Sequence, residues 1–465
     1  MRKSIHFIGI GGAGMSALAR YFLSQNWVVS GSDLSESPIT AELRKEGIKV
    51  KIGHKKGHIT AGMALVIYSQ AIRPNNPELK EASQRGIKAI SYPEAVGELT
   101  RQHKTIAVSG AHGKSTTTAL VALILEKNGI DPTVIMGANL KEFGGKNFRH
   151  GRSGYLVLEA DEFGRAFLHY SPTLAIVTNI DREHLDIYKN LADIKKTFMR
   201  FLANLHDGGT IIINRDDKNC YSLKKKIDAL ARRKKLQIIW YSLRGPAAKK
   251  IKKAIQILGS HNVSNALAAY HFGQTLKISE KNILAAIRAY RGVERRMQHR
   301  DDVRLATGDL SIYDDYAHHP TEIETTLRAF REKFPKAKIV CVFQPHQAKR
   351  LATLFKEFQD AFNNADITLI LPLYKVSGRD EETLIYTSEN LVRAIHKRQP
   401  KKLIFYLNDP KKLTIALSVL LSSLKSRPSS KTKNKTILVM MGAGNIVQYT
   451  DALLKWNPTN RAQSL

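Results

Sequence analysis

The stretch TIAVSGAHGKSTTT, residues 105–118, decides the fold class of this 465-residue chain. It begins as a short apolar strand, turns at Gly110 and Gly113, and continues as a helix that we expect to start at Ser115. Glycine permits the tight turn and a close approach to a ligand, while the unpaired N–H groups at the helix start attract an anion. Lys114 adds a mobile positive charge and Ser115 a hydroxyl that can bind Mg²⁺. The stretch therefore predicts a phosphate-binding loop.

This loop is shorter than the usual pattern, which places a glycine five residues before Gly113, where this chain has Val108. A plain helix start with chance glycines is the alternative. The strand before the loop and the helix from Ala119 to Lys127 after it argue against that alternative. We expect the phosphates of a nucleotide to contact Gly110, Ala111, His112, Gly113, Lys114, Ser115 and Thr116.

Composition predicts a soluble cytoplasmic protein of several domains. The length suits two to four domains, and 43% apolar residues are enough for ordinary cores. Two cysteines, Cys220 and Cys341, exclude a disulfide framework and favour a reducing compartment. The apolar N-terminus imitates a signal peptide, but its glycines would break the helix of such a segment. No apolar run approaches the roughly 20 residues of a membrane span, so we expect no membrane partner.

The formal charge of +32 comes from 73 Lys and Arg against 41 Asp and Glu. Such an excess is one mark of nucleic-acid binding. The lysines are scattered, however, and aromatic residues do not alternate with them as on a base-stacking surface. We therefore expect no nucleic-acid partner, and attribute the charge to a lysine-rich background and to small polyanionic substrates.

The first 33 residues carry a second glycine turn. Residues 4–8 predict a strand, GIGGAG follows at 9–14, a helix is expected from Met15 to Gln25, and a second strand from Trp27 to Ser30 leads to Asp33. This order is typical of a dinucleotide-binding unit, with Asp33 near the place of a ribose-binding acid. An NAD-dependent dehydrogenase would explain this unit alone, but not the loop at 105–118. The diphosphate is expected at Gly9, Gly11, Gly12, Ala13 and Gly14.

The central region predicts a second parallel α/β domain. An apolar strand at 155–159 ends in the acids Glu159, Asp161 and Glu162, and an acid in this position holds magnesium in phosphate-loop proteins. Glu159 is the candidate, with a plain acidic turn as the alternative. His184 follows the next strand and is either a second cation ligand or a capping residue. The lysine-rich residues 243–258 are expected to form a surface segment.

The remaining sequence predicts a third α/β domain, with strands at 310–314, 338–343, 367–371 and 436–441. Before it, Arg295 and Arg296 suit either contact with a triphosphate or plain solvation. Residues 422–435 are expected to be a polar loop, and the tail after Trp456 to be loose. The expected domains are residues 1–103, 104–298 and 299–465.

Together these motifs resemble those of the Mur ligases of peptidoglycan synthesis, from Ile5 to about Val447. The resemblance implies a Rossmann-like N-terminal domain for a uridine nucleotide sugar, a central P-loop ATPase-type domain, and a C-terminal Rossmann-like α/β domain for an amino acid. The motifs are GIGGAGMS (9–16), GAHGKS (110–115), EADE (159–162), TNIDREHLD (178–186), HNVSNA (261–266), GVERR (292–296), DDYAHHPTE (314–322) and FQPH (343–346).

The resemblance also implies an activity: ATP-dependent addition of L-alanine to the carboxylate of UDP-N-acetylmuramate through an acyl phosphate, by a monomer or weak dimer. A ligase that rejoins a recycled peptide to UDP-N-acetylmuramate is the alternative. The resemblance implies that Lys114 contacts the β- and γ-phosphates and that Ser115 and Glu159 hold one Mg²⁺. It also implies that His184 binds a second Mg²⁺, that Asn265 contacts the adenine side of ATP, and that Arg296 and Asp315 close over the nucleotide. The glycines at 9–14 would contact the UDP diphosphate. His346 and Arg350 would lie in the amino-acid or transition-state region.

Three positions depart from the family pattern. Ser115 stands where threonine is usual and keeps the hydroxyl. Gly164 stands where an acid is common. Gln347 stands where an arginine follows the histidine in familiar alanine ligases, which leaves the amino-acid contacts open.

Overall fold

The computed structural model describes residues 2–185, 187–305, 308–375, 386–423 and 435–455. The chain forms two compact units. The first consists of Met1–Glu183, Ile187–Gln256 and Asn262–Val293, and the second of His184–Asp186, Ile257–His261 and Glu294–Leu465. Most of the polar loop expected at 422–435, and all of the tail after Trp456, lie outside the described residues.

The first sheet confirms the Rossmann-like prediction. Its five parallel strands have the order β3-β2-β1-β4-β5. The order reverses beside β1, and a ligand crevice opens at the carboxyl end of the strands at such a point. The glycine turn follows β1 directly. The strands are β1 (Ser4–Ile8), β2 (Val28–Asp33), β3 (Lys49–Ile52), β4 (Leu65–Tyr68) and β5 (Ala89–Ser91), and the helices are α1 (Ala13–Ser24), α2 (Pro38–Lys45), α3 (Pro77–Gln84) and α4 (Tyr92–Arg101).

The second sheet has seven strands in the order β12-β11-β10-β6-β9-β7-β8, and β8 alone runs antiparallel to its neighbour. We did not predict the β7–β8 hairpin from the sequence. The strands are β6 (Lys104–Ser109), β7 (Thr133–Leu140), β8 (Lys146–Arg149), β9 (Tyr155–Glu159), β10 (Leu174–Val177), β11 (Thr210–Asn214) and β12 (Gln237–Tyr241). The helices are α5 (Lys114–Glu126), α6 (Leu191–Ala203), α7 (Lys218–Tyr221), α8 (Lys224–Lys234), α9 (Pro246–Ala254), α10 (Ser260–Thr275) and α11 (Glu280–Ala289).

The segment expected at the surface, residues 243–258, exposes its lysines and contains a helix that the sequence did not predict. Proline is favoured at a helix start, and α9 begins at Pro246. Ala248, Ile251 and Ala254 recur every three residues and are buried, while the lysines between them take the outer face. The sequence analysis did not recognise this apolar stripe because the segment contains more lysines than apolar residues of the stripe.

The third sheet, in the second unit, has six strands in the order β13-β14-β18-β15-β16-β17. Its strand β13 pairs antiparallel with β14 and was not predicted. Along β15, Ile339 and Cys341 belong to one buried cluster while Val340 and Val342 belong to another, so this sheet has a core on each face. The strands are β13 (Gln298–Leu305), β14 (Gly308–Asp315), β15 (Lys338–Phe343), β16 (Ile367–Ile370), β17 (Leu403–Tyr406) and β18 (Lys435–Met441). The helices are α12 (Pro320–Lys333), α13 (Ala348–Thr353), α14 (Phe355–Phe358), α15 (Ser388–Arg398), α16 (Leu413–Ser423) and α17 (Ile446–Lys455).

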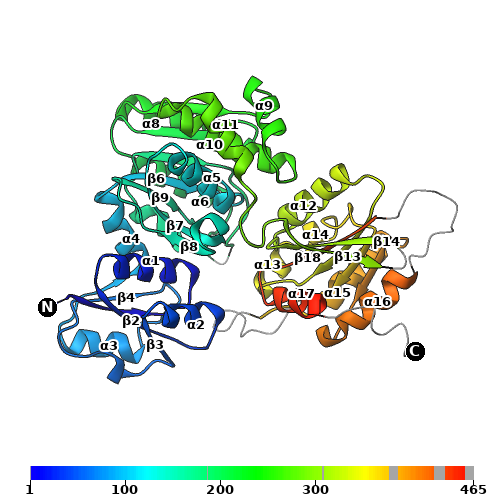
Figure 1. Ribbon diagram of the computed structural model, residues 1–465, viewed down its shortest axis with the longest axis horizontal. Coiled ribbons are helices and arrows are strands. Elements are labelled where there is room, and N and C mark those ends of the chain that lie inside the picture. The colour runs from blue at the N-terminus through cyan, green and yellow to red at the C-terminus, as the bar shows by residue number, and fades with distance from the viewer. Residues whose placement is uncertain (1, 186, 306–307, 376–385, 424–434, 456–465) are drawn as a thin grey trace. The chain divides into compact units, whose positions relative to one another are not determined.

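Within the first unit, helix α1 lies against the β7–β8 hairpin of the second sheet (Figure 1). The buried Asn147 on β8 donates from Nδ2 to the carbonyl oxygen of Ala13 at 2.7 Å. Its Oδ1 accepts from Arg20 Nη1, also at 2.7 Å. The helix that follows the first glycine turn is therefore fixed to the sheet that carries the second. Among the described residues, no helix combines the length and apolarity that crossing a membrane requires.

Candidate active site

The phosphate-binding loop lies between β6 and α5, and the end of β10 holds it. Asn179 Oδ1 accepts from the N–H of His112 at 2.8 Å, and Thr178 Oγ1 donates to the carbonyl of His112 at 2.7 Å. Gly110 has a φ of 139°, and a Cβ there would lie 2.0 Å from Thr178 Oγ1. Only glycine fits, because any side chain would push β10 away from the loop.

Gly113 precedes α5, which begins at Lys114, one residue before the predicted start. Its φ of 82° is left-handed, and a Cβ would lie 2.4 Å from Asn265 Oδ1. The structure thus brings Asn265, from helix α10, directly against the loop. Its predicted place on the adenine side of ATP stays a prediction.

Lys114 lies over the loop with acids around its ammonium group. Its Nζ donates to the carbonyl oxygen of Gly110 at 2.7 Å and to Glu162 Oε2 at 3.1 Å, and Asp161 Oδ1 is 3.6 Å away. Burial alone would lower the pKa of Lys114, but the carboxylates of Glu162 and Asp161 raise it above its ordinary value. The lysine therefore carries a full positive charge where a phosphate chain would lie.

Glu159 ends strand β9, which pairs with β6, and its register partner is Val108 just before the loop. Ser115 lies in the first turn of α5 at the same edge of the sheet. A Cβ on Gly137 would lie 3.1 Å from Glu159 Oε2, so the glycine lets this carboxylate approach the backbone of β7 closely. A hydroxyl and a carboxylate at one edge of the sheet suit Mg²⁺, which prefers oxygen ligands.

The glycine turn of the first sheet is held by the end of β2. The carbonyl oxygen of Ser32 accepts from the N–H groups of Gly9 and Ile10 at 2.8 and 3.0 Å. Asp33 Oδ2 accepts from the N–H of Gly11 at 2.8 Å. Asp33 therefore braces the turn itself, and its predicted contact with a ribose stays a prediction.

Tyr92, at the start of α4, was missed by the sequence analysis. A Cβ on Gly14 would lie 2.6 Å from its hydroxyl oxygen, so the tyrosine covers the first turn of α1. Burial raises the pKa of Tyr92, and the negative charges of Asp161 and Glu159 raise it further. Tyr92 thus packs on the helix that follows the glycine turn, within the electrostatic influence of two acids of the second sheet. No spacing rule marks a lone tyrosine in this place.

In the second unit, Asp315 holds the segment that leads into the third sheet. Its two carboxylate oxygens accept from the N–H groups of Met297 and Ala317, both at 2.8 Å. Burial raises the pKa of Asp315 to about 6, although Arg296 and the two N–H donors act against the rise. The Arg296 guanidinium lies 5.1 Å from the ring centre of Tyr316 and donates to Glu322 at 3.4 Å. Arg296 and Asp315 are thus close enough to interact electrostatically, and their predicted closure over the nucleotide stays a prediction.

Arg295, the other arginine of the pair, binds backbone carbonyl groups. Its Nη2 donates to the carbonyl oxygens of Gly442 and Gly444, at 2.5 and 3.2 Å. These glycines follow β18, so the side chain ties the incoming segment to the carboxyl edge of the third sheet.

His346 and Arg350 lie at that same edge, after β15. The His346 ring stacks on Tyr374 with a centroid separation of 5.6 Å and an interplanar angle of 10°. Arg350 Nη1 donates to the carbonyl oxygen of His346 at 3.1 Å. Gln347, the departure from the family pattern, has a left-handed φ of 69°. The structure therefore brings the two predicted residues together and adds Tyr374, which the sequence analysis did not single out.

His184 belongs to the second unit and has a left-handed φ of 54°. Its predicted role as ligand of a second Mg²⁺ stays a prediction, and Asp186 of the same motif lies outside the described residues.

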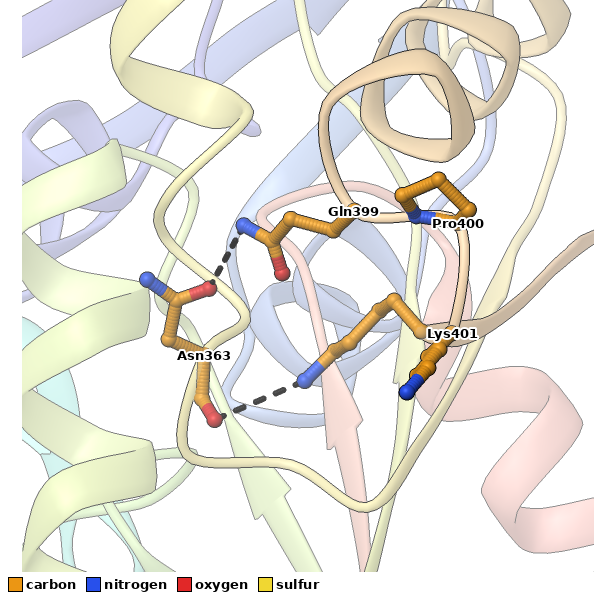
Figure 2. A pocket seen from close by; sticks show the side chains of 5 residues that line it. Asn363, Gln399, Pro400 and Lys401 are labelled. Carbon is orange, nitrogen blue, oxygen red and sulfur yellow. Dashed lines mark hydrogen bonds between the residues drawn. The ribbon is translucent and has the colours of Figure 1, made fainter.

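A surface hollow of the third sheet lies away from these residues. Figure 2 shows Gln399 donating to Asn363 Oδ1 at 3.0 Å across it. Its lining comes from residues just before β16 and β17, at the amino ends of these parallel strands. The candidate residues follow the carboxyl ends, so this hollow is not part of the candidate site.

A Rossmann-like sheet with a glycine turn, followed by a phosphate-binding loop with an acid on the adjacent strand, defines a nucleotide-using α/β enzyme of several domains. Comparison with known proteins places it more narrowly: the chain belongs to the Mur ligase family. Residues 4–104 match the model described as "Mur ligase family, catalytic domain", residues 108–273 the "Mur ligase middle domain", and residues 295–444 the "Mur ligase, glutamate ligase domain".

The similar proteins match over almost their whole length. The UDP-N-acetylmuramate–L-alanine ligase of Persephonella marina is 37% identical over 462 residues, which cover 97% of this chain and 96% of the relative. That of a Sulfurihydrogenibium strain is 35% identical, with 98% of each chain covered. The crystal structure of the UDP-N-acetylmuramate–alanine ligase of Thermotoga maritima aligns with a TM-score of 0.75 at 26% identity, covering 99% of both chains. A murein peptide ligase of Psychrobacter arcticus shares the fold, with a TM-score of 0.68 at 22% identity.

Proposed function

We propose that this protein joins L-alanine to the lactyl carboxylate of UDP-N-acetylmuramate, with cleavage of ATP to ADP and phosphate, in the cytoplasmic stage of peptidoglycan synthesis. The observation that carries the proposal is the phosphate-binding loop with Lys114 above it and Glu159 on the adjacent strand. The similar proteins over the whole chain, named for this reaction, support the choice of substrates.

The loop binds the triphosphate of ATP in this proposal. The N–H groups at the start of α5 face the phosphates, and Lys114 leaves Glu162 to contact the β- and γ-phosphates. Asn265 lies against Gly113 and contacts the nucleoside side of the loop. The side chains of Thr178 and Asn179 keep the loop in shape, so little reorganisation is needed when ATP binds.

Ser115 and Glu159 would hold Mg²⁺ beside the phosphates. When bound there, Mg²⁺ would reduce the repulsion between the triphosphate and the substrate carboxylate. His184 is proposed as a ligand of a second ion.

The glycine turn at 9–14 binds the diphosphate of the sugar nucleotide. A carboxylate oxygen of the substrate attacks the γ-phosphorus of ATP, the bond to the β-phosphate oxygen breaks, and ADP leaves. The positive charge of Lys114 stabilises the charge that develops on the transferred group. The product of this step is an acyl phosphate, which acylates far more readily than a carboxylate.

The amino group of alanine then attacks the acyl carbon. A tetrahedral intermediate forms, inorganic phosphate leaves with the bonding electrons, and the nitrogen gives up a proton as the amide forms. We assign the amino acid to His346 and Arg350 at the carboxyl edge of the third sheet, and closure over the nucleotide to Arg296 and Asp315. Exclusion of water protects the acyl phosphate from hydrolysis.

Phosphate release by the purified protein tests this proposal. Release should require ATP, Mg²⁺, UDP-N-acetylmuramate and L-alanine together, and mass spectrometry should find the alanyl amide of the sugar nucleotide. A panel of glycine, L-serine and an L-alanyl tripeptide defines the amino-acid site. Turnover with the tripeptide but not with alanine would replace this function by peptide recycling.

A further inference from the structure

The first sheet contains a buried cluster of titratable side chains that the proposed mechanism does not use. Glu78, in the first turn of α3, is fully buried. Three histidines surround its carboxylate: His6 from β1, and His54 and His58 from the segment after β3. These residues come from separate parts of the chain, and only the fold brings them together.

The Glu78 carboxylate is held on both oxygens. Oε2 accepts from Ser32 Oγ at 2.6 Å and lies 3.6 Å from His6 Nε2. Oε1 is 2.6 Å from His58 Nδ1 and accepts from the N–H of Lys55 at 3.2 Å. Both oxygens therefore face hydrogen-bond donors, and only an ionised carboxylate can accept hydrogen bonds on both oxygens without donating one.

Burial by itself would raise the pKa of Glu78, but the interactions with His6, Ser32 and His58 outweigh it and lower the pKa to about 2. Glu78 therefore stays ionised inside the domain. A buried charge rarely adds stability over a well-packed apolar side chain of the same volume, so stability alone does not account for it.

Two ring nitrogens of the cluster are buried with little to bind: His54 Nε2 makes no hydrogen bond to any residue that the structure describes, and His6 Nε2 has only its 3.6 Å contact with Glu78. Buried polar atoms are nearly always hydrogen-bonded, and exceptions concentrate where a protein stores strain or performs a function. The cluster is therefore built at a cost that a merely structural core would avoid.

Ser32 connects this cluster to the glycine turn. Its hydroxyl binds Glu78 and lies 2.9 Å from His54 Nδ1, while its carbonyl oxygen accepts from the N–H groups of Gly9 and Ile10. Ser32 is thus bonded to the cluster through its side chain and to the first two N–H groups of the turn through its backbone. Asp33, next in sequence, holds the N–H of Gly11.

We propose that Glu78, with His6, His54 and His58, is a positioning residue for the diphosphate of the nucleotide sugar: it clamps Ser32 and thereby fixes the orientation of the glycine turn. This role rests on the proposed function, because it assumes that the turn binds a nucleoside diphosphate sugar. If the turn is loosened, the substrate has to order it on binding, and this cost weakens the binding of the substrate. The reaction at the carboxylate of the substrate is not altered.

The test is a comparison of Glu78→Gln with the wild-type enzyme. The amide keeps the shape but removes the charge, so at least one contact to Ser32 or His58 is lost. We expect the KM for UDP-N-acetylmuramate to rise about tenfold, while kcat and the KM values for ATP and L-alanine stay within twofold. Glu81→Gln, on the same helix but in a surface pair with Arg85, is the matched control and should leave every constant unchanged.

A second variant covers the case that Glu78→Gln fails to fold. Ser32→Ala keeps the backbone carbonyl but removes the hydroxyl that the cluster clamps, and should raise the same KM in the same direction. Calorimetry with UDP-N-acetylmuramate, in the presence of a non-hydrolysable ATP analogue and Mg²⁺, should show the same weakening.

The outcomes separate this proposal from the proposed function. If the wild-type protein does not bind UDP-N-acetylmuramate, the proposed function fails. If it binds and the folded variants bind equally well, the positioning role is overturned. A fall in kcat with all KM values unchanged would mean that less of the variant is folded. That result would also overturn the positioning role.

Discussion

The Lys114 ammonium group lies 3.1 Å from the Glu162 carboxylate, in the loop where a phosphate chain would lie. Glu162 is almost fully buried, so the pair is poorly screened by solvent. The lysine is thus held over the loop by an acid of the neighbouring motif, and a phosphate chain would compete with that acid for the ammonium group.

Replacing Lys114 by alanine should abolish phosphate release. The substitution removes the positive charge aimed at the transferred group, and the loss of one such interaction typically costs at least about 100-fold in rate. A phosphate-release assay at saturating substrates measures the effect. Lys127→Ala, at the other end of α5 and exposed, should retain full activity. Equal activity of both variants would contradict the role of Lys114.

A methyl group on Gly113 should weaken ATP binding. The left-handed φ of 82° strains any other residue, and the new Cβ would collide with Asn265 Oδ1 at 2.4 Å. We expect Gly113→Ala to raise the KM for ATP by at least about tenfold. Gly129→Ala at the end of α5 has a similar φ of 77° but open space around the Cβ. It should cost about 1 kcal/mol of stability and leave the KM for ATP unchanged.

Asn147→Ala should destabilise the first unit. The side chain is buried and bridges Ala13 and Arg20, so its removal takes one hydrogen bond from the Ala13 carbonyl and one from the Arg20 guanidinium, and separates the hairpin from α1. We expect a loss of about 2–4 kcal/mol in the free energy of unfolding, measured by urea denaturation. Lys146→Ala, at the adjacent residue, removes only a partly exposed pair with Glu46 and should change this free energy by no more than about 1 kcal/mol. Equal stability of the two variants would show that the hairpin does not hold α1.

The two glycine turns were predictable because their backbone conformations leave marks in the sequence. Gly110 and Gly113 need positive φ values and leave no room for a Cβ, so the spacing alone locates the loop. Glu159 was found because it ends an apolar strand next to that loop. The wider family match adds residues such as Asn265 that no local pattern reveals.

Other features depend on tertiary contacts that the sequence does not display. The β7–β8 hairpin contains glycines and charged residues, and it is stabilised by packing against α1 rather than by its own propensity. The acid Asp33 suited a ribose contact by position, but its bond to Gly11 depends on the exact path of the turn. The cluster around Glu78 draws residues from β1, β2, α3 and a loop, and no window of sequence contains it.

Asp315 gives the second unit a pH dependence of known sign. Its pKa rises from 3.8 to about 6 because it is buried, so the folded state keeps a proton on this carboxyl that the unfolded state releases. The free energy of unfolding should therefore fall as pH rises from about 4 to 6, by up to about 3 kcal/mol, and this contribution is lost above pH 6. Urea unfolding of the second unit at half-unit steps between pH 4.5 and 6.5 measures the slope. Asp315→Asn should flatten it, whereas Asp309→Asn, exposed on the same strand, should keep it. If the slope survives in Asp315→Asn, another group must titrate in this range.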